Sequence, residues 1–369
     1  MNATTPRRQL LDFIAGQGPA VIPSPLMSER IVREYLQRDW TVRQDDQRLI
    51  RGWVQIGEAC GFAPVIKAEM GSLDVRQPRL ERLLDTPEKT RDRYFYETPL
   101  GALDWITTRV KDSSHDDKKA IESIEDIKKL VWVQEHLNDY EAYRRKVRYF
   151  LDTIGEGGLF AVNIPLPFNV LGDRESLIYV ASEEPEALHE AVDRTLAVNL
   201  QLMDIAAEEG VRVFFTAQLD SNMLSPGMIE EWQVPAAIQM RVRAHERGAV
   251  FYLHDCGNMR RKLADGVYNR IRPDWLEGFE APPLGDIEDL HAARVALAPE
   301  IAIKGNLNIE RLAQGTPEET YQATRRVLEQ VRGYRHVMGS ACSLLRHTPL
   351  DNIRALTQAT RDFVADLRS

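Results

Sequence analysis

The sequence is poor in cysteine and contains neither a strongly basic segment nor a long apolar run. Its 369 residues include 3 cysteines, and a count this small and odd excludes a disulfide framework. The formal net charge is −9 without any basic stripe, so nucleic acid is not expected as a partner. No apolar run approaches the roughly 20 residues of a membrane span, and residues 1–18 lack the apolar core of a signal peptide. These absences predict a cytoplasmic protein without a membrane partner.

Two nucleotide-binding signatures are also missing. Gly157 and Gly158 do not follow a strand in a Gly-x-Gly-x-x-Gly frame, so no dinucleotide-binding turn is predicted, and no phosphate-binding loop occurs. The composition, 43% hydrophobic and 28% charged residues, is typical of a globular protein. A chain of this length fits one large α/β barrel or two ordinary domains.

From about residue 155 onward, short apolar runs alternate with longer helical segments. The predicted strands cover residues 159–163, 211–215, 249–253, 276–279, 301–304 and 337–338. Helix starts with a capping residue followed by proline are predicted at Ser225-Pro226, Thr316-Pro317 and Thr348-Pro349. Alternation of this kind is typical of βα units in a parallel sheet. Because it continues to the C-terminus, it favours an α/β fold of the (β/α)8 TIM-type barrel class over an open doubly wound sheet.

The first 150 residues are less regular. The elements predicted there are strands at 20–23 and 64–70, an interrupted helix between about 28 and 60, and a hairpin over 93–101. The charged run at 111–119 predicts a solvated loop. No linker or internal repeat divides the chain, so we predict one domain over residues 1–369. In it, residues 1–150 form an irregular N-terminal helical and hairpin extension with the first barrel elements, and residues 151–369 form the regular βα repeats.

Residues that can bind a metal follow three of the predicted strands. His254 and Cys256 follow the predicted strand at 249–253, Glu280 follows the strand at 276–279, and Cys342 follows the strand at 337–338. Residues i and i+2 of an extended segment point the same way, so His254 and Cys256 can close on one ion. Imidazole, thiolate and carboxylate groups in a tetrahedral shell are the ligands of zinc. The C-terminal ends of barrel strands meet around one site, and the sequence therefore predicts a zinc centre there.

Each of these residues also has a structural interpretation. A lone histidine at such a position is more often a hydrogen-bonded core residue, and a lone cysteine is more often a buried thiol. Their joint occurrence at strand ends favours the metal. Glu277 precedes Glu280 closely, and strand ends are predicted only to within about two to four residues, so the choice of carboxylate depends on the strand boundary. The third cysteine, Cys60, is interpreted as a core thiol of an amphipathic helix.

Further polar residues are predicted at other strand ends. Asp220 is predicted to be catalytic together with Glu280, although an aspartate at this position also suits a cap of the following helix. Asn163 and Asn306 are predicted to line the barrel mouth and to contact the substrate.

Several longer motifs match a known pattern. They are Glu97-Thr98-Pro99-Leu100-Gly101, Asp220-Ser221 with Leu224-Ser225-Pro226, Ile303-Lys304-Gly305-Asn306-Leu307, and Thr348-Pro349-Leu350-Asp351. With these motifs the chain resembles the uroporphyrinogen decarboxylase superfamily over most of its length. Within it, the chain is similar to the zinc-dependent, corrinoid-linked methyltransferases of the methylcobamide:coenzyme M type. The ligand order of that branch, His-x-Cys, a later Glu and a late Cys, corresponds to His254, Cys256, Glu280 and Cys342.

The decarboxylase branch of the superfamily fits less well. Its Arg-x-Ala-Gly-Arg segment near the N-terminus does not occur here, and its late histidine falls where this chain has Cys342. The resemblance therefore implies transfer of a methyl group between a corrinoid (methylcobalamin, or a corrinoid partner protein) and a small-molecule thiol or other soft donor or acceptor. In that reaction zinc would lower the pKa of an incoming thiol, which replaces Glu280.

Two alternatives stay open at this point. The first is a cofactor-free decarboxylase of a polycarboxylate, which needs a cationic pocket; Arg260, Arg261 and Lys304 are the candidate cations near predicted strand ends. The second is a non-catalytic member of the superfamily that only binds a metal or a corrinoid.

Overall fold

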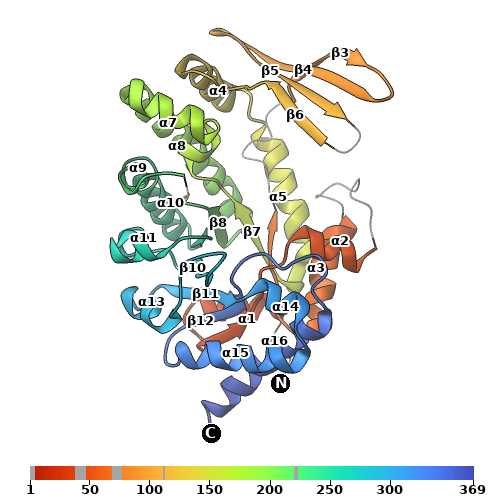
Figure 1. The fold of residues 1–369 in the computed structure, drawn as a ribbon, viewed down its shortest axis with the longest axis vertical. Helices are drawn as coiled ribbons and strands as arrows, with labels where there is room; N and C mark the ends of the chain where they lie inside the picture. The colour runs from red at the N-terminus through yellow and green to blue at the C-terminus, as the bar shows by residue number, and fades with distance from the viewer. Residues whose placement is uncertain (1–4, 38–46, 69–76, 111–112, 220–222) are drawn as a thin grey trace.

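Eight parallel strands form the central sheet of the computed structural model, which describes residues 5–37, 47–68, 77–110, 113–219 and 223–369. The strands are β1 (Val21–Pro23), β2 (Val65–Ala68), β7 (Leu159–Asn163), β8 (Val213–Ala217), β9 (Val250–Asp255), β10 (Trp275–Gly278), β11 (Ala302–Leu307) and β12 (His336–Ser340). Their order in the sheet is β1-β12-β11-β10-β9-β8-β7-β2. The outermost strands are thus consecutive in the chain. The side chain of Ser24, just after β1, donates a hydrogen bond of 2.9 Å to the carbonyl of Ala63, just before β2. The sheet curls as in a TIM-type barrel, and the predicted fold class is confirmed (Figure 1).

Helices alternate with these strands and cover the outside of the sheet (Figure 1). They are α1 (Pro6–Ile14), α2 (Glu29–Tyr35), α3 (Gln47–Cys60), α4 (Ile124–His136), α5 (Tyr140–Ile154), η1 (Gly155–Gly157), α6 (Pro167–Val170), α7 (Arg174–Glu183), α8 (Pro185–Glu208), α9 (Pro226–Trp232), α10 (Val234–Glu246), α11 (Arg260–Ala264), α12 (Val267–Ile271), α13 (Leu290–Ala296), α14 (Ile309–Gln314), α15 (Pro317–Gln330) and α16 (Leu350–Asp366). Ser225 and Thr316 cap α9 and α15 as predicted, and Thr316 forms a capping box with Glu319. Thr348 does not cap α16, because that helix begins one residue later than predicted and its N-cap is Pro349. Among the described residues, no helix combines the length and the apolarity needed to cross a bilayer.

The interior of the barrel is filled by a layer of apolar side chains. Its members are Ile22, Val65, Ala161, Phe215, Tyr252, Trp275, Ala302 and Val337, one from each strand. Leu10 and Phe13 of α1 close the layer from below, with the rings of Phe13 and Trp275 6.1 Å apart. Side chains two residues further along a strand point to the same side. On five of these strands the next inward position is polar: Lys67, Asn163, His254, Glu277 and Lys304. The apolar layer therefore supports a polar layer at the C-terminal end of the barrel.

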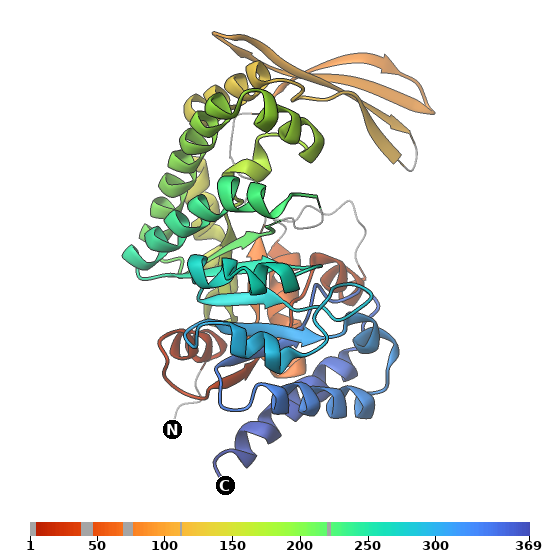
Figure 2. The ribbon, with the colours of Figure 1, turned by 60° about the vertical axis from the view of Figure 1, so that its left-hand side comes forward.

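A second sheet lies at one end of the molecule, away from the barrel (Figures 1 and 2). It consists of the antiparallel strands β3 (Arg79–Asp85), β4 (Lys89–Thr98), β5 (Gly101–Val110) and β6 (Ser113–Lys118) in that order. The predicted hairpin is the β4–β5 turn, and α4 packs against both of these strands.

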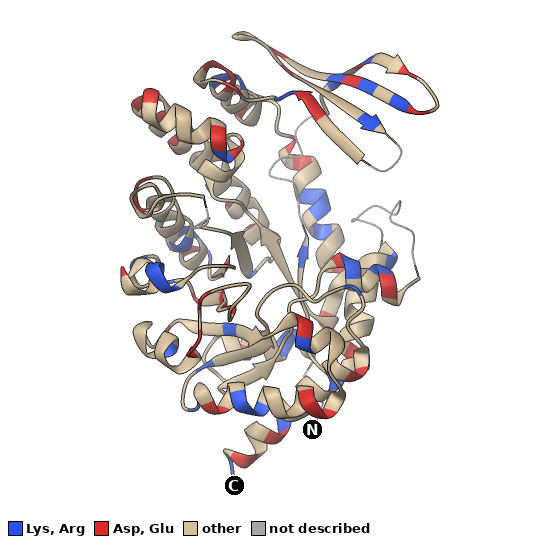
Figure 3. Ribbon diagram, viewed as in Figure 1, with Lys and Arg blue, Asp and Glu red and all other residues tan. Residues whose placement is uncertain are grey.

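The predicted solvated loop at 111–119 is wrong, because residues 113–118 form β6. Asp116 accepts a hydrogen bond of 2.7 Å from Thr107, and Asp117 forms an ion pair of 2.5 Å with Arg91. Lys, Arg, Asp and Glu occur along the strands of this sheet (Figure 3). The charged run is therefore an edge strand whose charges are matched across the sheet. That residues 1–369 form one domain stays a prediction.

We expect Trp275→Ala to lower the free energy of unfolding by about 3–5 kcal/mol, because it leaves a cavity in the apolar layer. Trp275 is 1% exposed and also contacts the ring of Tyr252 at 5.6 Å. Urea unfolding followed by circular dichroism measures the change. Val295→Ala is the control, since Val295 is 59% exposed on α13 and its loss should cost less than about 0.5 kcal/mol. Equal stability of the two variants would contradict the layered packing.

Candidate metal centre

Three of the predicted metal ligands lie together at the C-terminal end of the barrel. One ligand atom each from His254, Cys256 and Cys342 lies within 4.8 Å of the others. His254 lies on β9 and Cys256 directly follows it, whereas Cys342 follows β12, which is separated from β9 in the sheet by β10 and β11. The curl of the sheet brings these strand ends face to face. His254 is buried and the two cysteines are half-buried, so the cluster is sheltered but reachable.

The three groups share hydrogen bonds in a way that suits a cation. Hydrogen bonds from Cys342 and His254 lower the pKa of Cys256 from 9.0 to about 4. The hydrogen bond to Cys256, together with burial, raises the pKa of Cys342 above its ordinary value. Burial lowers the pKa of His254, but hydrogen bonds with Cys256 and Glu277 outweigh it and raise that pKa to about 9. The ligand atoms thus hold protons between them, and a soft divalent cation would replace these protons.

Glu277 fixes the orientation of the histidine. Nδ1 of His254 donates a hydrogen bond of 2.8 Å to Oε2 of Glu277, which leaves Nε2 for the cysteine side of the cluster. Lys304 donates to Oε1 of the same carboxylate. His254, Glu277 and Lys304 are register partners on β9, β10 and β11. A carboxylate bound to the distal nitrogen of a histidine ligand is a common feature of zinc sites.

The charge of Glu277 is maintained by two lysines. Burial would raise the pKa of the fully buried Glu277 carboxyl, but Lys304 and Lys67 hold it below its ordinary range. Lys67 Nζ lies 3.9 Å from Oε2 of Glu277. Burial lowers the pKa of Lys67 to about 8, against the opposite influence of Glu277. The carboxylate thus stays ionised and keeps accepting the proton of His254.

Glu280, the predicted fourth ligand, lies beside the cluster but outside the group of three atoms. Its Oε2 accepts a hydrogen bond of 2.8 Å from the backbone N–H of Gly257. Burial, together with the charge of Cys256, raises the pKa of Glu280. Coordination by Glu280 stays a prediction.

The other predicted site residues divide into three cases. Asp220 lies outside the described residues. The amide of Asn306 donates a hydrogen bond of 2.9 Å to the carbonyl of Phe279, so it ties β11 to the segment after β10. Asn163 points into the barrel, and its buried side-chain oxygen has no hydrogen-bond partner within the described ranges. Cys60 is a buried thiol far from the cluster in sequence and structure, 4% exposed, with its sulfur 3.7 Å from the carbonyl of Leu350.

Lys67, Glu277 and Gln218 have supporting roles that were not predicted from the sequence. Gln218 Nε2 donates to the sulfur of Cys256 at 2.7 Å. The sequence does contain a signal for Lys67 and Glu277, because each is a charged residue within an otherwise apolar strand. A charge at such a position is buried and needs an opposite charge nearby.

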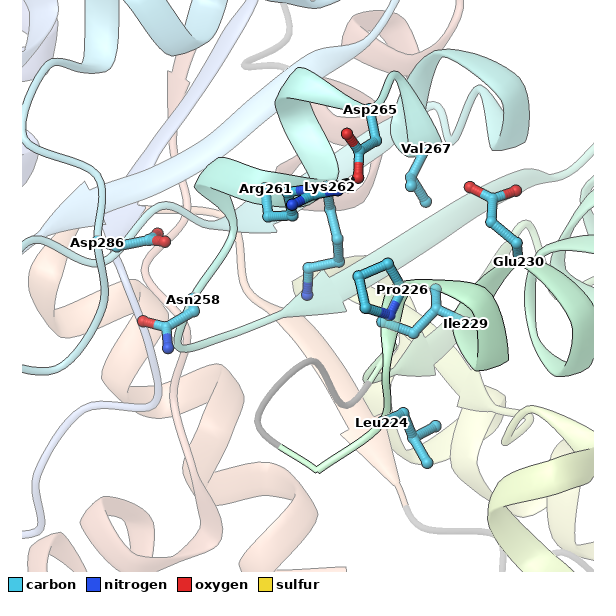
Figure 4. Close-up of a pocket in the computed structure, with 10 residues that line it drawn as sticks. All are labelled: Leu224, Pro226, Ile229, Glu230, Asn258, Arg261, Lys262, Asp265, Val267 and Asp286. Atoms are coloured by element: carbon cyan, nitrogen blue, oxygen red, sulfur yellow. Dashed lines mark hydrogen bonds and ion pairs between the residues drawn. The ribbon is translucent and has the colours of Figure 1, made fainter. Parts of the chain in front are cut away.

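A cavity of about 440 Å³ lies between α9 and the segment that follows β9 (Figure 4). Leu224, Pro226, Ile229, Glu230, Asn258, Arg261, Lys262, Asp265, Val267 and Asp286 line it. Its cations have partners: Arg261 pairs with Asp265 at 2.6 Å, and Lys262 pairs with Asp255 at 2.5 Å. Arg260, at its edge, binds the carbonyl of Asp286 at 2.7 Å. The arginines and lysines that a polycarboxylate would need are therefore already neutralised or bound.

A sequence profile described as Uroporphyrinogen decarboxylase (URO-D) matches residues 171–363, more than half of the chain. The chain belongs to the uroporphyrinogen decarboxylase family. The matched segment contains all three clustered residues, Glu277 and Glu280, whereas Lys67 and Asn163 precede it.

Two curated proteins are similar to the chain. The methylated-thiol–coenzyme M methyltransferase of Methanosarcina mazei is 26% identical over 208 residues, which cover 54% of this chain and 53% of that protein. The uroporphyrinogen decarboxylase of Novosphingobium aromaticivorans is 26% identical over 193 residues, which cover 49% of this chain and 51% of that protein. The chain thus spans about half the length of the curated relatives it matches.

Solved structures show a similar fold along the whole chain. A methyltransferase from Methanosarcina mazei has a TM-score of 0.67 at 13% identity and covers 97% of this chain and 99% of its own. A putative vitamin-B12 independent methionine synthase from Listeria monocytogenes has a TM-score of 0.52 at 10% identity and covers 93% of this chain and 96% of its own. At these identities the likeness concerns the fold alone.

We expect the protein to hold about one equivalent of zinc per chain, and Cys342→Ser and Cys256→Ser to reduce this to less than about a tenth, because each removes a thiolate ligand. Elemental analysis of protein purified without added metal measures it. Cys60→Ala is the matched control and should keep its zinc, since Cys60 lies apart from the cluster. If the zinc content of Cys342→Ser is unchanged, Cys342 is a core thiol and not a metal ligand.

Glu277→Gln should weaken zinc binding about 10- to 100-fold, because the partner that orients His254 loses its charge. Competition with a chelating dye measures the affinity. The double variant Glu277→Gln/Lys304→Met avoids an unpaired buried ammonium and should show the same loss. Glu288→Gln, at a carboxylate whose side chain is 74% exposed, serves as the control. If both Glu277 variants bind zinc with wild-type affinity, Glu277 does not support the metal centre.

Proposed function

We propose that this protein is a zinc-dependent methyltransferase that moves a methyl group between a corrinoid and a small-molecule thiol or other soft group. The observation that carries the proposal is the convergence of His254, Cys256 and Cys342 within 4.8 Å at the mouth of the barrel. The likeness to a methylated-thiol–coenzyme M methyltransferase supports the same reaction class.

The donor set fits zinc better than a harder cation. Two sulfur atoms and one imidazole nitrogen suit a soft tetrahedral ion, whereas magnesium and calcium prefer oxygen. When bound, zinc supplies the Lewis acidity that turns a thiol into a thiolate at neutral pH. Two thiolate ligands make the centre electron-rich, which suits a nucleophilic sulfur more than activation of water.

The residues of this chain prepare that step. Glu277 keeps His254 in one tautomer, and Gln218 donates a hydrogen bond to the sulfur of Cys256. Glu280 is held beside the cluster because its Oε2 accepts a hydrogen bond from the N–H of Gly257. We propose that Glu280 would be the fourth ligand of the metal at rest and that an incoming thiol would take its place. The raised pKa of the Glu280 carboxyl suits it to receive the proton of that thiol. Asp220 is retained as a further candidate catalytic residue.

The methyl group itself would be carried by a corrinoid, either free methylcobalamin or a corrinoid on a partner protein. In one direction the thiolate attacks the methyl group and leaves the corrinoid reduced by two electrons, as cob(I)alamin. In the other direction the corrinoid removes a methyl group from a bound donor. The proposal covers both directions of transfer. We also propose a cytoplasmic location for the protein.

A decarboxylase of a polycarboxylate is the second candidate, favoured by the family's description and by the Novosphingobium relative. The pairing of Arg261, Lys262 and Lys304 with carboxylates argues against it. An anaerobic assay with uroporphyrinogen distinguishes the two: formation of coproporphyrinogen would support the decarboxylase and overturn the methyltransferase proposal.

We expect the zinc-loaded protein to demethylate methylcobalamin in the presence of a suitable thiol, with release of about one proton when the thiol binds near neutral pH. The loss of methylcobalamin is followed spectroscopically under anaerobic conditions, and sulfur coordination is followed by X-ray absorption at the zinc edge. Cys256→Ser should abolish the reaction, and Glu280→Gln should keep more zinc than Cys256→Ser. If no thiol changes the coordination of the zinc and methylcobalamin is not demethylated, the metal site is structural and not catalytic.

A further inference from the structure

Gln218, the residue after β8, combines an unusual backbone with a hydrogen bond to a candidate metal ligand. Its φ angle is 81°, in the left-handed region that residues other than glycine rarely adopt. Its side-chain Nε2 donates to the sulfur of Cys256 at 2.7 Å. A backbone in this region is strained and persists only where neighbouring groups hold it. The contacts of this segment therefore identify the residues on which the hydrogen bond to Cys256 depends.

An asparagine of α6 holds the backbone at Gln218. Nδ2 of Asn169 donates to the carbonyl of Gln218 at 3.0 Å and to the carbonyl of Ala217 at 3.3 Å. Its Oδ1 accepts a hydrogen bond of 2.9 Å from Nε2 of Gln233. Because the oxygen of this amide is engaged by a donor, its NH2 group is directed at the two carbonyls. The orientation of the Asn169 amide is thus set by its partners on both sides.

The segments that carry Asn169 and Gln233 are also joined by an aromatic contact. Gln233 is fully buried at the junction of α9 and α10, where it follows one helix and precedes the other. The preceding residues of the two segments, Phe168 and Trp232, have ring centroids 5.8 Å apart, and both are buried. Two adjacent contacts, one apolar and one polar, therefore keep α6 in place against this junction.

A second group holds the chain just beyond Gln218. The backbone N–H of Leu219 donates to Oδ1 of Asp255 at 3.2 Å. Asp255 is the buried residue between the two candidate ligands near the end of β9, and its Oδ2 accepts from Lys262 at 2.5 Å and from Tyr268 at 2.6 Å. The chain at Gln218 is therefore fixed from two sides, by α6 and by the strand that carries the ligands.

The side chain of Gln218 is not needed for these backbone contacts. Asn169 binds its carbonyl, and Asp255 binds the N–H of the next residue. The amide of Gln218 is directed instead at the sulfur of Cys256. A hydrogen bond to a ligand atom restricts where that atom lies and withdraws electron density from it. Groups that bind metal ligands in this way contribute to the affinity for the metal.

We propose that Asn169 is a positioning residue of the metal centre. It holds Gln218 in the left-handed conformation, and this conformation aims the Gln218 amide at the sulfur of Cys256. The sulfur is thereby directed towards the other two candidate ligands, His254 and Cys342. The inference rests on the metal centre and goes beyond the proposed function, because it is independent of the group that the centre transfers.

A double-mutant cycle on cobalt(II) binding tests this role. Competition with a chelating dye measures the affinity, and the sulfur-to-cobalt charge-transfer absorption measures sulfur coordination. Gln218→Met removes the donor at similar length, and Asn169→Leu removes the clamp at similar size. We expect each variant to bind cobalt about 10-fold more weakly and to show an altered charge-transfer absorption. Because Asn169 acts through Gln218, the double variant should also lose about 10-fold, whereas independent effects would multiply to about 100-fold.

Asn269→Leu is the matched control. The amide of Asn269 also donates to a carbonyl, that of Ala296 at 2.9 Å, and accepts from a donor, the N–H of Ala298 at 2.8 Å, but these contacts join α12 to the C-terminal end of α13. This variant should lose stability in urea unfolding and keep the wild-type cobalt affinity and absorption. A purely structural role of Asn169 would give Asn169→Leu the same result as the control.

If Asn169→Leu does not fold, Asn169→Asp takes its place with the same expected loss, since it keeps the oxygen that accepts from Gln233 and lacks the NH2 group. Wild-type cobalt affinity and absorption in a folded Asn169 variant, or a loss of about 100-fold in the double variant, would overturn the inference. Absence of cobalt binding by the wild type would overturn it together with the metal centre. Failure of the metal-loaded protein to demethylate methylcobalamin would count against the proposed function alone.

Discussion

The buried carboxylate of Glu277 is the interaction on which the centre depends. It is fully buried in β10 and accepts from His254 on one side and Lys304 on the other. An isolated charge at this depth would be costly, and the adjacent lysines make it tolerable. In return, the carboxylate determines which nitrogen of His254 faces the cysteines. Without it, the imidazole could rotate or change tautomer, and the three ligand atoms would not converge.

The layering of the barrel explains why this polar network lies at one end only. At inward positions, β9, β10 and β11 carry the apolar residues Tyr252, Trp275 and Ala302, followed two residues later by the polar residues His254, Glu277 and Lys304. These three strands change from apolar to polar at the same level because they are in register. The apolar layer excludes water from below, which strengthens the electrostatic interactions above it. The clustered polar groups therefore lie at the mouth of the barrel, where Cys256 and Cys342 follow the strands.

Much of this could be predicted from the sequence, because the relevant signals are local. The spacing of His254 and Cys256 follows from strand geometry, and the alternation of strands and helices indicates the barrel. The meeting with Cys342 depends on how far the sheet curls, which no local pattern gives. The supporting role of Lys67 depends on β2 lying beside β7, nearly a hundred residues later in the chain. The charged run that forms β6 was misinterpreted because its partners, such as Arg91, lie on other strands.

The electrostatics of the mouth also bear on the choice between alkyl transfer and decarboxylation. A decarboxylase that binds several carboxylates needs several cations without protein partners. Among the described residues, Lys304 is paired with Glu277 and Lys262 with Asp255, and Lys67 lies 3.9 Å from the same Glu277 carboxylate. The adjacent cysteine sulfurs suit a soft reacting atom. The combination favours a small substrate with a reactive sulfur over a large polycarboxylate, because binding each carboxylate would require breaking an ion pair that already stabilises the fold.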